Sequence, residues 1–355
     1  MRWDTSPWTL KGAPRMAQFV ATDHDPGADR AAARVDELEA SAAQPFEVDG
    51  GGRILVGTAS WTDPTMTAAG VFYPVGADSA EERLQYYAST FPVVEVDATY
   101  YALPAERTAQ LWVDRTPPDF TFDIKAHALM TGQGTETKRL PKAIREALPD
   151  DLKAKTRIYA KDLPEELKDE VWSMFRQGLA PLAERGQLGS ILLQYPKWVF
   201  PSSENRALIE EAVVRLEGWT CAVEFRNGSW LNEKNAERTT RFLAERNIPF
   251  VMVDEPQGFK SSVPPEVLVT SSDLALVRFH GRNAETWEKK GITPAERFRF
   301  LYSRDELTEW VPRIKEAASE AKEVHLMFNN CYANYGTTNA REIAALLLDL
   351  EAADA

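Results

Sequence analysis

One short stretch, Cys221–Trp230, combines the pattern of a buried strand with two charged side chains. Apolar residues enter it and Asn227-Gly228 closes it, which is typical of a strand that ends in a turn. Side chains alternate across a strand, so Glu224 and Arg226 share one face. A strand does not need a carboxylate and a guanidinium on one face, so both are candidates for a polar pocket at its carboxyl end.

The same arrangement recurs along the chain, because polar or ionisable side chains close seven of the eight strands that the sequence predicts. Burying an unpaired charge costs several kcal/mol, so these groups must pair with one another or contact a ligand. They are Glu95, Asp97, Thr99 and Tyr101; Asp123, Lys125 and His127; Gln194; Glu224 and Arg226; Asp254; Arg278 and His280; and Asn329 and Asn330.

This inventory predicts proton transfer on a small polyhydroxylated, anionic molecule. Crowding of Glu224 with Glu95 or Asp254 would raise the pKa of one carboxyl and leave the other ionised, as acid and base require. Cationic side chains would bind a phosphate or carboxylate, and amides would bind hydroxyls. The candidate catalytic residues are Glu224, His280, Lys125 and Glu95. The candidate ligand-binding residues are Arg226, Arg278, Gln194, Asp254, Asn329, Asn330, Tyr100, Trp230 and His127.

Structural roles compete with these assignments. Glu224 and Arg226 could form an ion pair that closes the end of the sheet, and His127 could be a hydrogen-bonded core histidine. Trp230 and Tyr100 suit the face of a sugar, but they equally suit closure of the core. No zinc-ligand spacing is present and no cofactor is evident. A magnesium or manganese ion held by Glu95, Glu224 and Asp254 stays open.

Strict alternation of strand and helix patterns predicts a parallel sheet. Eight repeats over roughly 300 residues favour a closed (β/α)8 TIM-type barrel, whose site lies at the carboxyl ends of the strands. No Gly-x-Gly-x-x-Gly follows the first strand, which argues against a dinucleotide fold. The predicted strands are 54–60, 93–101, 120–127, 190–195, 221–226, 249–254, 274–280 and 324–330, with a long insert over 131–168 after the third.

Residues 1–52 are predicted to be an N-terminal extension, partly helical or flexible, and residues 53–355 the barrel domain. Gly50-Gly51-Gly52 has the pattern of a hinge between them. A helix is predicted over 30–43. Trp3, Trp8 and Phe19 are expected to anchor the extension on the barrel.

Composition limits the partners and the cellular location that we expect for the protein. A net charge of −13 argues against a general nucleic-acid or anionic-membrane surface. The two cysteines cannot form a disulfide framework, and no signal peptide or membrane span is evident, which predicts a cytoplasmic protein. The expected partner is an anionic small molecule, and the oligomeric state stays open.

Eight motifs together resemble the DUF72 family, also called YecE-like, over roughly residues 53–350. The resemblance implies a TIM-type barrel and no assigned function. It gives as patterned positions Glu95, Lys125, Gln194, Glu224, Arg226, Arg278, His280, Asn329 and Asn330. The motifs are Gly57-Thr58-Ala59-Ser60-Trp61, Phe72-Tyr73-Pro74, Glu95-Val96-Asp97-Ala98-Thr99-Tyr100-Tyr101, Phe122-Asp123-Ile124-Lys125, Leu193-Gln194-Tyr195-Pro196, Val223-Glu224-Phe225-Arg226 with Ser229-Trp230, Arg278-Phe279-His280-Gly281-Arg282 and Phe328-Asn329-Asn330.

The leading hypothesis is therefore an isomerase- or lyase-like enzyme for a polyhydroxy or phosphorylated metabolite. Glu224 would be its acid–base group, with His280 or Lys125 as partner. One alternative is a hydrolase that uses two carboxylates or a metal ion. The other is a protein that binds a ligand in the same pocket without turnover, as a sensor or scaffold.

Overall fold

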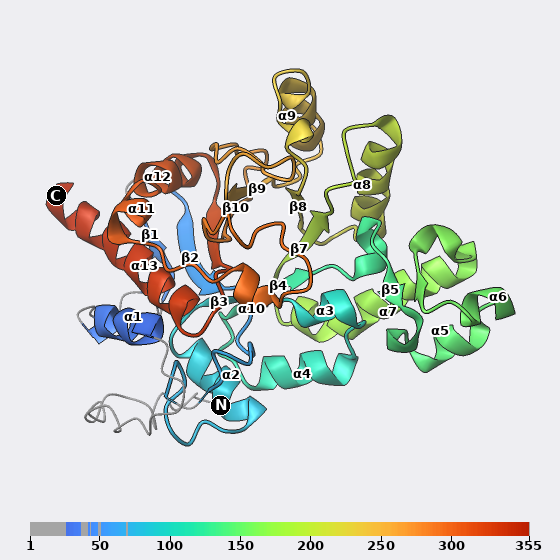
Figure 1. Ribbon diagram of the computed structural model, residues 1–355, viewed down its shortest axis with the longest axis horizontal. Helices are drawn as coiled ribbons and strands as arrows, with labels where there is room; N and C mark the ends of the chain where they lie inside the picture. Colours follow the sequence, from blue (N-terminus) through green and yellow to red (C-terminus); the bar gives the residue numbers. More distant parts are fainter. Residues whose placement is uncertain (1–25, 37–41, 43, 49–50, 69, 355) are drawn as a thin grey trace.

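A parallel sheet forms the centre of the computed structural model, which describes residues 26–36, 42, 44–48, 51–68 and 70–354. Each central strand lies beside its neighbours in the chain, and Val223 meets Phe250 in a bridge between the two ends of the sheet. The sheet is therefore a nearly closed barrel, as predicted (Figure 1). Its strands are β2 (Arg53–Thr58), β3 (Val93–Val96), β4 (Thr121–Lys125), β7 (Leu188–Tyr195), β8 (Cys221–Phe225), β9 (Val251–Asp254), β10 (Leu274–Phe279) and β11 (Glu323–Phe328).

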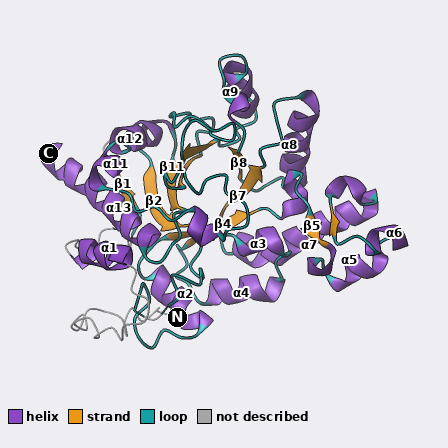
Figure 2. Ribbon diagram, in the orientation of Figure 1, coloured by secondary structure: helices purple, strands orange, loops and turns teal. Residues whose placement is uncertain are grey.

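Helices alternate with the strands and surround the barrel (Figure 2). The connection from β9 to β10 is an exception, because residues 255–273 run as a loop. The helices outside the insert and the extension are α2 (Ala80–Ala88), α3 (Ala98–Tyr101), α4 (Glu106–Asp114), α7 (Glu165–Glu184), α8 (Ser203–Arg215), η4 (Gly228–Trp230), α9 (Ala236–Ala244), α10 (Pro294–Arg297), α11 (Arg304–Thr308), α12 (Val311–Glu320) and α13 (Tyr335–Asp354).

A long insert follows β4, as predicted, and lies beside α7 at one edge of the molecule (Figure 1). Its two short strands pair antiparallel, with Glu136 opposite Arg157. The elements are η1 (Ala128–Thr131), β5 (Thr135–Glu136), η2 (Thr137–Arg139), α5 (Lys142–Ala147), α6 (Asp150–Lys153), β6 (Arg157–Ile158) and η3 (Ala160–Asp162).

The described part of the N-terminal extension packs on the barrel. Helix α1 (Pro26–Asp36) contacts α13, and Arg34 donates to Glu342 at 2.6 Å and to the Tyr302 carbonyl at 2.7 Å. Strand β1 (Phe46–Glu47) pairs antiparallel with β2. The expected anchors Trp3, Trp8 and Phe19 lie outside the described residues, and the domain boundary at residue 52 stays a prediction.

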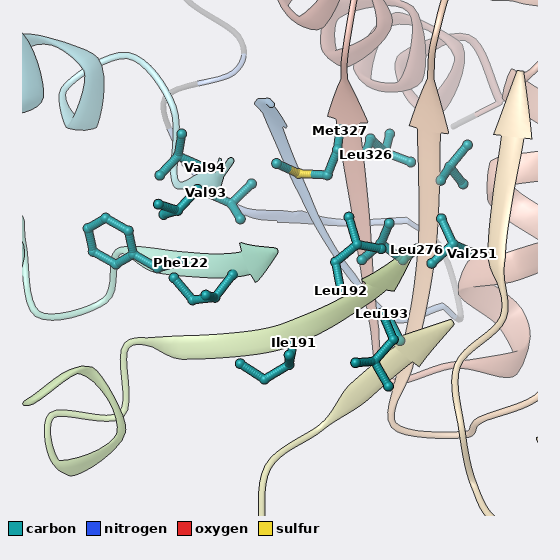
Figure 3. Close-up of a cluster of buried hydrophobic side chains, with 14 of the residues drawn as sticks. Val93, Val94, Phe122, Ile191, Leu192, Leu193, Val251, Leu276, Leu326 and Met327 are labelled. Carbon is teal, nitrogen blue, oxygen red and sulfur yellow. The ribbon is translucent and has the colours of Figure 1, made fainter. Parts of the chain in front are cut away.

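Apolar side chains from most of the strands pack together, because a parallel strand is buried on both faces. Figure 3 shows one cluster built from β3, β4, β7, β9, β10 and β11. Its labelled members are Val93, Val94, Phe122, Ile191, Leu192, Leu193, Val251, Leu276, Leu326 and Met327. This packing fixes the strand register on which the polar ends depend.

Six strands end earlier than the sequence pattern predicts, and β3 differs most. β3 stops at Val96, and Ala98–Tyr101 turns into helix α3. The Thr99 hydroxyl donates to the Lys125 carbonyl at 2.6 Å, which ties that turn to the end of β4. The predicted extension of this strand to residue 101 is therefore wrong, because a side-chain hydrogen bond replaces the ladder there.

No helix in the described part of the chain is both long and apolar enough to cross a membrane.

A polar cluster lies inside the barrel, toward the start of the strands. His325 contacts the carboxylates of Asp123 and Glu323, each at 2.7 Å, and the Ser190 hydroxyl donates to Asp123 at 2.7 Å. Burial opposes a charge on His325, but the two carboxylates outweigh it and raise its pKa to about 10. His325 is therefore an imidazolium that binds β4 to β11 across the barrel.

This raised pKa makes stability depend on pH. His325 contributes fully below its unfolded pKa of about 6.5, and that contribution is lost as pH rises through its folded pKa. We expect the free energy of unfolding to fall by several kcal/mol between about pH 6.5 and pH 10. Urea unfolding across that range measures it, with an Asp123→Asn variant showing the fall at lower pH. Flat stability with an imidazole that titrates near pH 6.5 would contradict the assignment.

Candidate active site

The Arg278 guanidinium lies at the centre of the barrel's carboxyl end, completely buried between two carboxylates. Its Nε and Nη2 donate to the two oxygens of Glu95 at 2.8 and 2.6 Å. Its Nη1 donates to Glu224 Oε2 at 2.5 Å. The three residues come from β10, β3 and β8, so one guanidinium joins distant strands across the barrel.

The other oxygen of Glu224 has three polar neighbours. Gln194 Nε2 donates to Glu224 Oε1 at 2.7 Å. Arg226 Nη1 lies 3.4 Å and His280 Nε2 lies 3.3 Å from the same oxygen. Burial raises the pKa of the Glu224 carboxyl, but the positive charge of Arg278 and the other neighbours reverse this and hold it well below its usual value. Glu224 is therefore an ionised carboxylate.

Glu95 differs from Glu224 although both contact the same guanidinium. Burial raises the pKa of the Glu95 carboxyl to about 7, against the lowering effect of Arg278. Asp97 adds a like charge that raises it further. The two carboxyls thus have pKa values displaced in opposite directions, which is the arrangement of a paired acid and base.

The imidazole of His280 is neutral, and a hydrogen bond fixes its orientation. Asn329 Nδ2 donates to its Nδ1 at 2.9 Å, which places the ring proton on Nε2, facing Glu224. Burial, reinforced by the nearby charge of Arg226, lowers the pKa of His280 to about 3. Nε2 lies 3.3 Å from Glu224 Oε1 without meeting hydrogen-bond geometry, so this buried donor is unsatisfied within the described residues.

Two further cations, Lys125 and Arg226, lie at the rim of the barrel's carboxyl end and are partly exposed. Lys125 forms an ion pair with Asp97 at 3.1 Å and lies over the Tyr100 ring, 5.3 Å from its centroid. Tyr100 in turn donates to Gln133 Oε1 at 2.8 Å. Burial opposes the charge of Lys125, but the neighbouring carboxylates, Asp97 foremost, raise its pKa.

On the other side of the rim, Arg226 donates to Glu255 at 2.7 Å and lies over the Trp287 ring, 4.6 Å from its centroid. Burial raises the pKa of Glu255 to about 7, although Arg226 lowers it. Trp287 and Phe298 also pack beside His280, at ring centroid distances of 6.1 and 5.8 Å. The segment between β10 and α11 therefore covers the centre on this side.

Access to the centre is limited. The side chains of Glu95, Glu224, Arg278 and His280 are at most 1% exposed, whereas Lys125 and Arg226 are 15% and 17% exposed. The rim is thus the part that solvent reaches. A pocket of about 700 Å³ lies in the insert instead, apart from these residues.

Four predicted ligand-binding residues lie outside this network. Asp254 accepts hydrogen bonds from Arg282, Tyr302 and Trp310 in a separate cluster. The other three serve local structure. Trp230 is buried and stacks on Phe225, Asn330 donates to the Phe300 carbonyl and Asn339, and His127 caps η1 with a pKa that burial lowers to about 4.

The carboxylates named for a divalent ion do not converge. Glu95 and Glu224 are bound to Arg278, while Asp254 is bound to Arg282. Among the described residues, no group of three or more His, Cys, Asp or Glu side chains is placed to hold a metal ion. The structure thus provides no three-carboxylate site for magnesium or manganese from this set.

The contacts also include residues that the sequence did not identify as site candidates. Glu255 follows Asp254 directly, so its position after a predicted strand was the available signal. Asp97 stood among the strand-end residues but was not selected. Trp287 and Gln133 lie in loops, where no periodic pattern marks them.

A family model described as "Protein of unknown function DUF72" matches residues 55–354. The chain belongs to the DUF72 family. It is 31% identical over 301 residues to UPF0759 protein YunF of Bacillus subtilis, an alignment that covers 84% of this chain and 95% of that protein. Crystal structures of DUF72 family proteins from Enterococcus faecalis and Thermotoga maritima match with TM-scores of 0.65 and 0.64 and identities of 26% and 29%. Each match covers 83% of this chain, and 95% and 99% of the respective relative.

Removing the central guanidinium should damage the fold. Arg278→Met leaves two buried carboxylates without their partner, which typically costs about 3–5 kcal/mol. Arg241→Met, which removes an exposed pair with Glu237, should cost at most about 1 kcal/mol. Urea unfolding of both variants measures the difference. A Glu95→Gln/Arg278→Met double variant should recover part of the loss, and equal small losses in all three variants would contradict the account.

Proposed function

We propose that this DUF72 protein is an enzyme that moves a proton on a small polyhydroxy or phosphorylated metabolite at the carboxyl end of the barrel. The observation that carries the proposal is the shared guanidinium of Arg278. It binds Glu95 and Glu224, whose pKa values are displaced in opposite directions. A fold needs neither two buried carboxylates nor their unequal acidity, whereas proton transfer at neutral pH uses both.

Each polar side chain then has a role. Glu224, ionised, removes a proton from a substrate carbon beside a carbonyl group. His280 donates from Nε2 to that carbonyl oxygen and stabilises the negative charge that develops on it. Return of the proton from Glu224 to the former carbonyl carbon, with transfer of a proton from the adjacent hydroxyl to the former carbonyl oxygen, completes an isomerisation without an oxidant or reductant. Expulsion of a leaving group from the carbon on the other side of the deprotonated carbon instead completes an elimination, and the proton on Glu224 passes to the departing group.

Lys125 and Arg226 are suited to hold the anionic end of the substrate. Both are partly exposed, and Arg226 has a planar guanidinium held against Trp287. The network holds four carboxyl groups against three cations, with Glu255 buried beside Arg226 and Asp97 paired with Lys125. Glu95 and Glu255, with pKa values of about 7, can take up a proton and so offset the charge of an anionic ligand.

Binding without turnover is the second candidate, and one observation favours it. Arg278, Arg226 and Lys125 each already have a protein carboxylate as partner, and the centre is at most 1% exposed. Substrate could reach Glu224 only if the segment around Trp287 moved away from His280. A protein that senses a ligand at the rim would not require that movement.

Hydrogen–deuterium exchange separates the two. We expect a panel of aldoses, ketoses and their phosphates in D₂O to contain a compound that loses a carbon-bound proton signal by NMR with the wild-type protein. Glu224→Gln should slow that exchange by at least about 100-fold, within the range of general acid–base effects. The exposed variant Glu237→Gln should leave the rate unchanged.

The pattern of results decides between the candidates. A compound that binds but exchanges no proton supports the ligand-binding protein. Exchange that persists in a folded Glu224→Gln variant contradicts the assigned base.

A further inference from the structure

A second polar site lies in the insert, formed by β5, η2, α5, α6 and β6. The pocket there has a volume of about 700 Å³. Five cationic side chains and one carboxylate are among its lining residues. They are Lys138, Arg145, Lys153, Lys155, Arg157 and Glu136. The proton-transfer mechanism proposed for the barrel uses none of them.

The backbone holds these side chains in place. β5 and β6 pair through Thr135–Ile158 and Glu136–Arg157. The pairing continues into η2, where the Thr137 N–H donates to the Thr156 carbonyl at 3.0 Å. Apolar residues in and beside η2, α5, α6 and β6 are buried. These are Leu140, Ile144, Leu148, Leu152 and Ile158. The cations therefore project from fixed walls rather than from a free loop.

Protein carboxylates balance this charge incompletely. Glu136 is shared between Lys138 at 3.0 Å and the neighbouring Arg139 at 3.5 Å. Lys153 and Lys155 have only distant partners on the exposed surface, Asp150 at 3.6 Å and Asp162 at 3.7 Å. Such exposed pairs are weak.

The guanidinium of Arg145 makes no ion pair or hydrogen bond within the described part of the chain. It leaves a planar set of donors free at the pocket wall.

A basic pocket stands out on a chain of net charge −13. Charges more than about 8 Å away are largely screened at physiological salt, so a small ligand experiences mainly the local cations. A long polyanion would also extend over the acidic remainder of the surface and be repelled. The charge distribution therefore favours a compact anion over a nucleic-acid strand.

We propose that the insert pocket binds a small polyanion that carries two or more phosphate groups. One phosphate ester carries a charge of about −1.5 to −2, which is less than the net charge of +4 that five cations and the carboxylate of Glu136 give the lining. Arginine suits bidentate contact with phosphate oxygens, and lysine supplies mobile point charges around them. The site is separate from the barrel's carboxyl end, so a ligand here would regulate or localise the protein rather than react.

The test uses tripolyphosphate and the full chain, with calorimetric titration at low and at physiological salt. We expect saturable binding of one molecule per chain that weakens with salt. Arg145→Ala/Lys153→Ala should weaken it by at least about tenfold, because two cationic contacts are lost. The control Lys142→Ala/Lys161→Ala changes net charge equally at exposed positions outside the pocket, and should stay within about twofold. Thermal unfolding verifies that both variants keep the fold.

Four results would overturn the proposal. These are the absence of saturable binding, equal weakening in both double variants, loss of binding in Lys125→Met, and tighter binding of a single-stranded oligonucleotide than of tripolyphosphate. The third would move the anion to the rim of the barrel, and the fourth would make nucleic acid the occupant. Proton transfer is tested separately, by exchange with Glu224→Gln, so the failure of one proposal is distinguishable from the failure of the other.

Discussion

A guanidinium completely removed from water is the constraint on which this structure depends. Arg278 loses its hydration on folding, and only well-placed carboxylates compensate that cost. Glu95 and Glu224 do so from β3 and β8, on opposite sides of β10 in the barrel order. These three side chains meet only when the strands pair in one register. The apolar packing between strands and helices stabilises that register. Hydrophobic burial closes the barrel, while this ion network selects how its carboxyl end is arranged.

The same network sets the chemistry. Arg278 contacts both carboxyls, but their pKa values differ. Glu224 stays ionised because Gln194 and Arg226 also contact it, whereas burial dominates at Glu95 and raises its pKa. Neutral His280 adds a donor that is unsatisfied within the described residues. One cluster thus holds an ionised carboxylate, a carboxyl group close to half-protonation at neutral pH, and an unsatisfied donor. This arrangement supports the proton transfer that we propose, although the segment that contains Trp287 covers the centre.

The positions of the central site residues were predictable from the sequence. Side chains alternate along a strand and parallel strands end at one edge, so Glu95, Glu224 and Arg278 had to face the barrel interior near its carboxyl end. Residues just beyond a strand escape that rule, because the chain has left the ladder. Trp230 therefore turned into the core and Asn330 toward the Phe300 carbonyl, while Glu255 rather than Asp254 turned toward Arg226. The insert pocket was not predictable, because it forms from short elements whose pairing no periodic pattern specifies.

The most direct test of the central claim is a carboxyl ¹³C NMR titration of Glu95 and Glu224, assigned with Glu95→Gln and Glu224→Gln. The account predicts that Glu224 stays ionised well below the usual glutamate range, while Glu95 takes up its proton near pH 7. Two carboxyls that titrate together near the ordinary glutamate value of about 4.3 would contradict it, because a shared buried guanidinium could not leave both unperturbed.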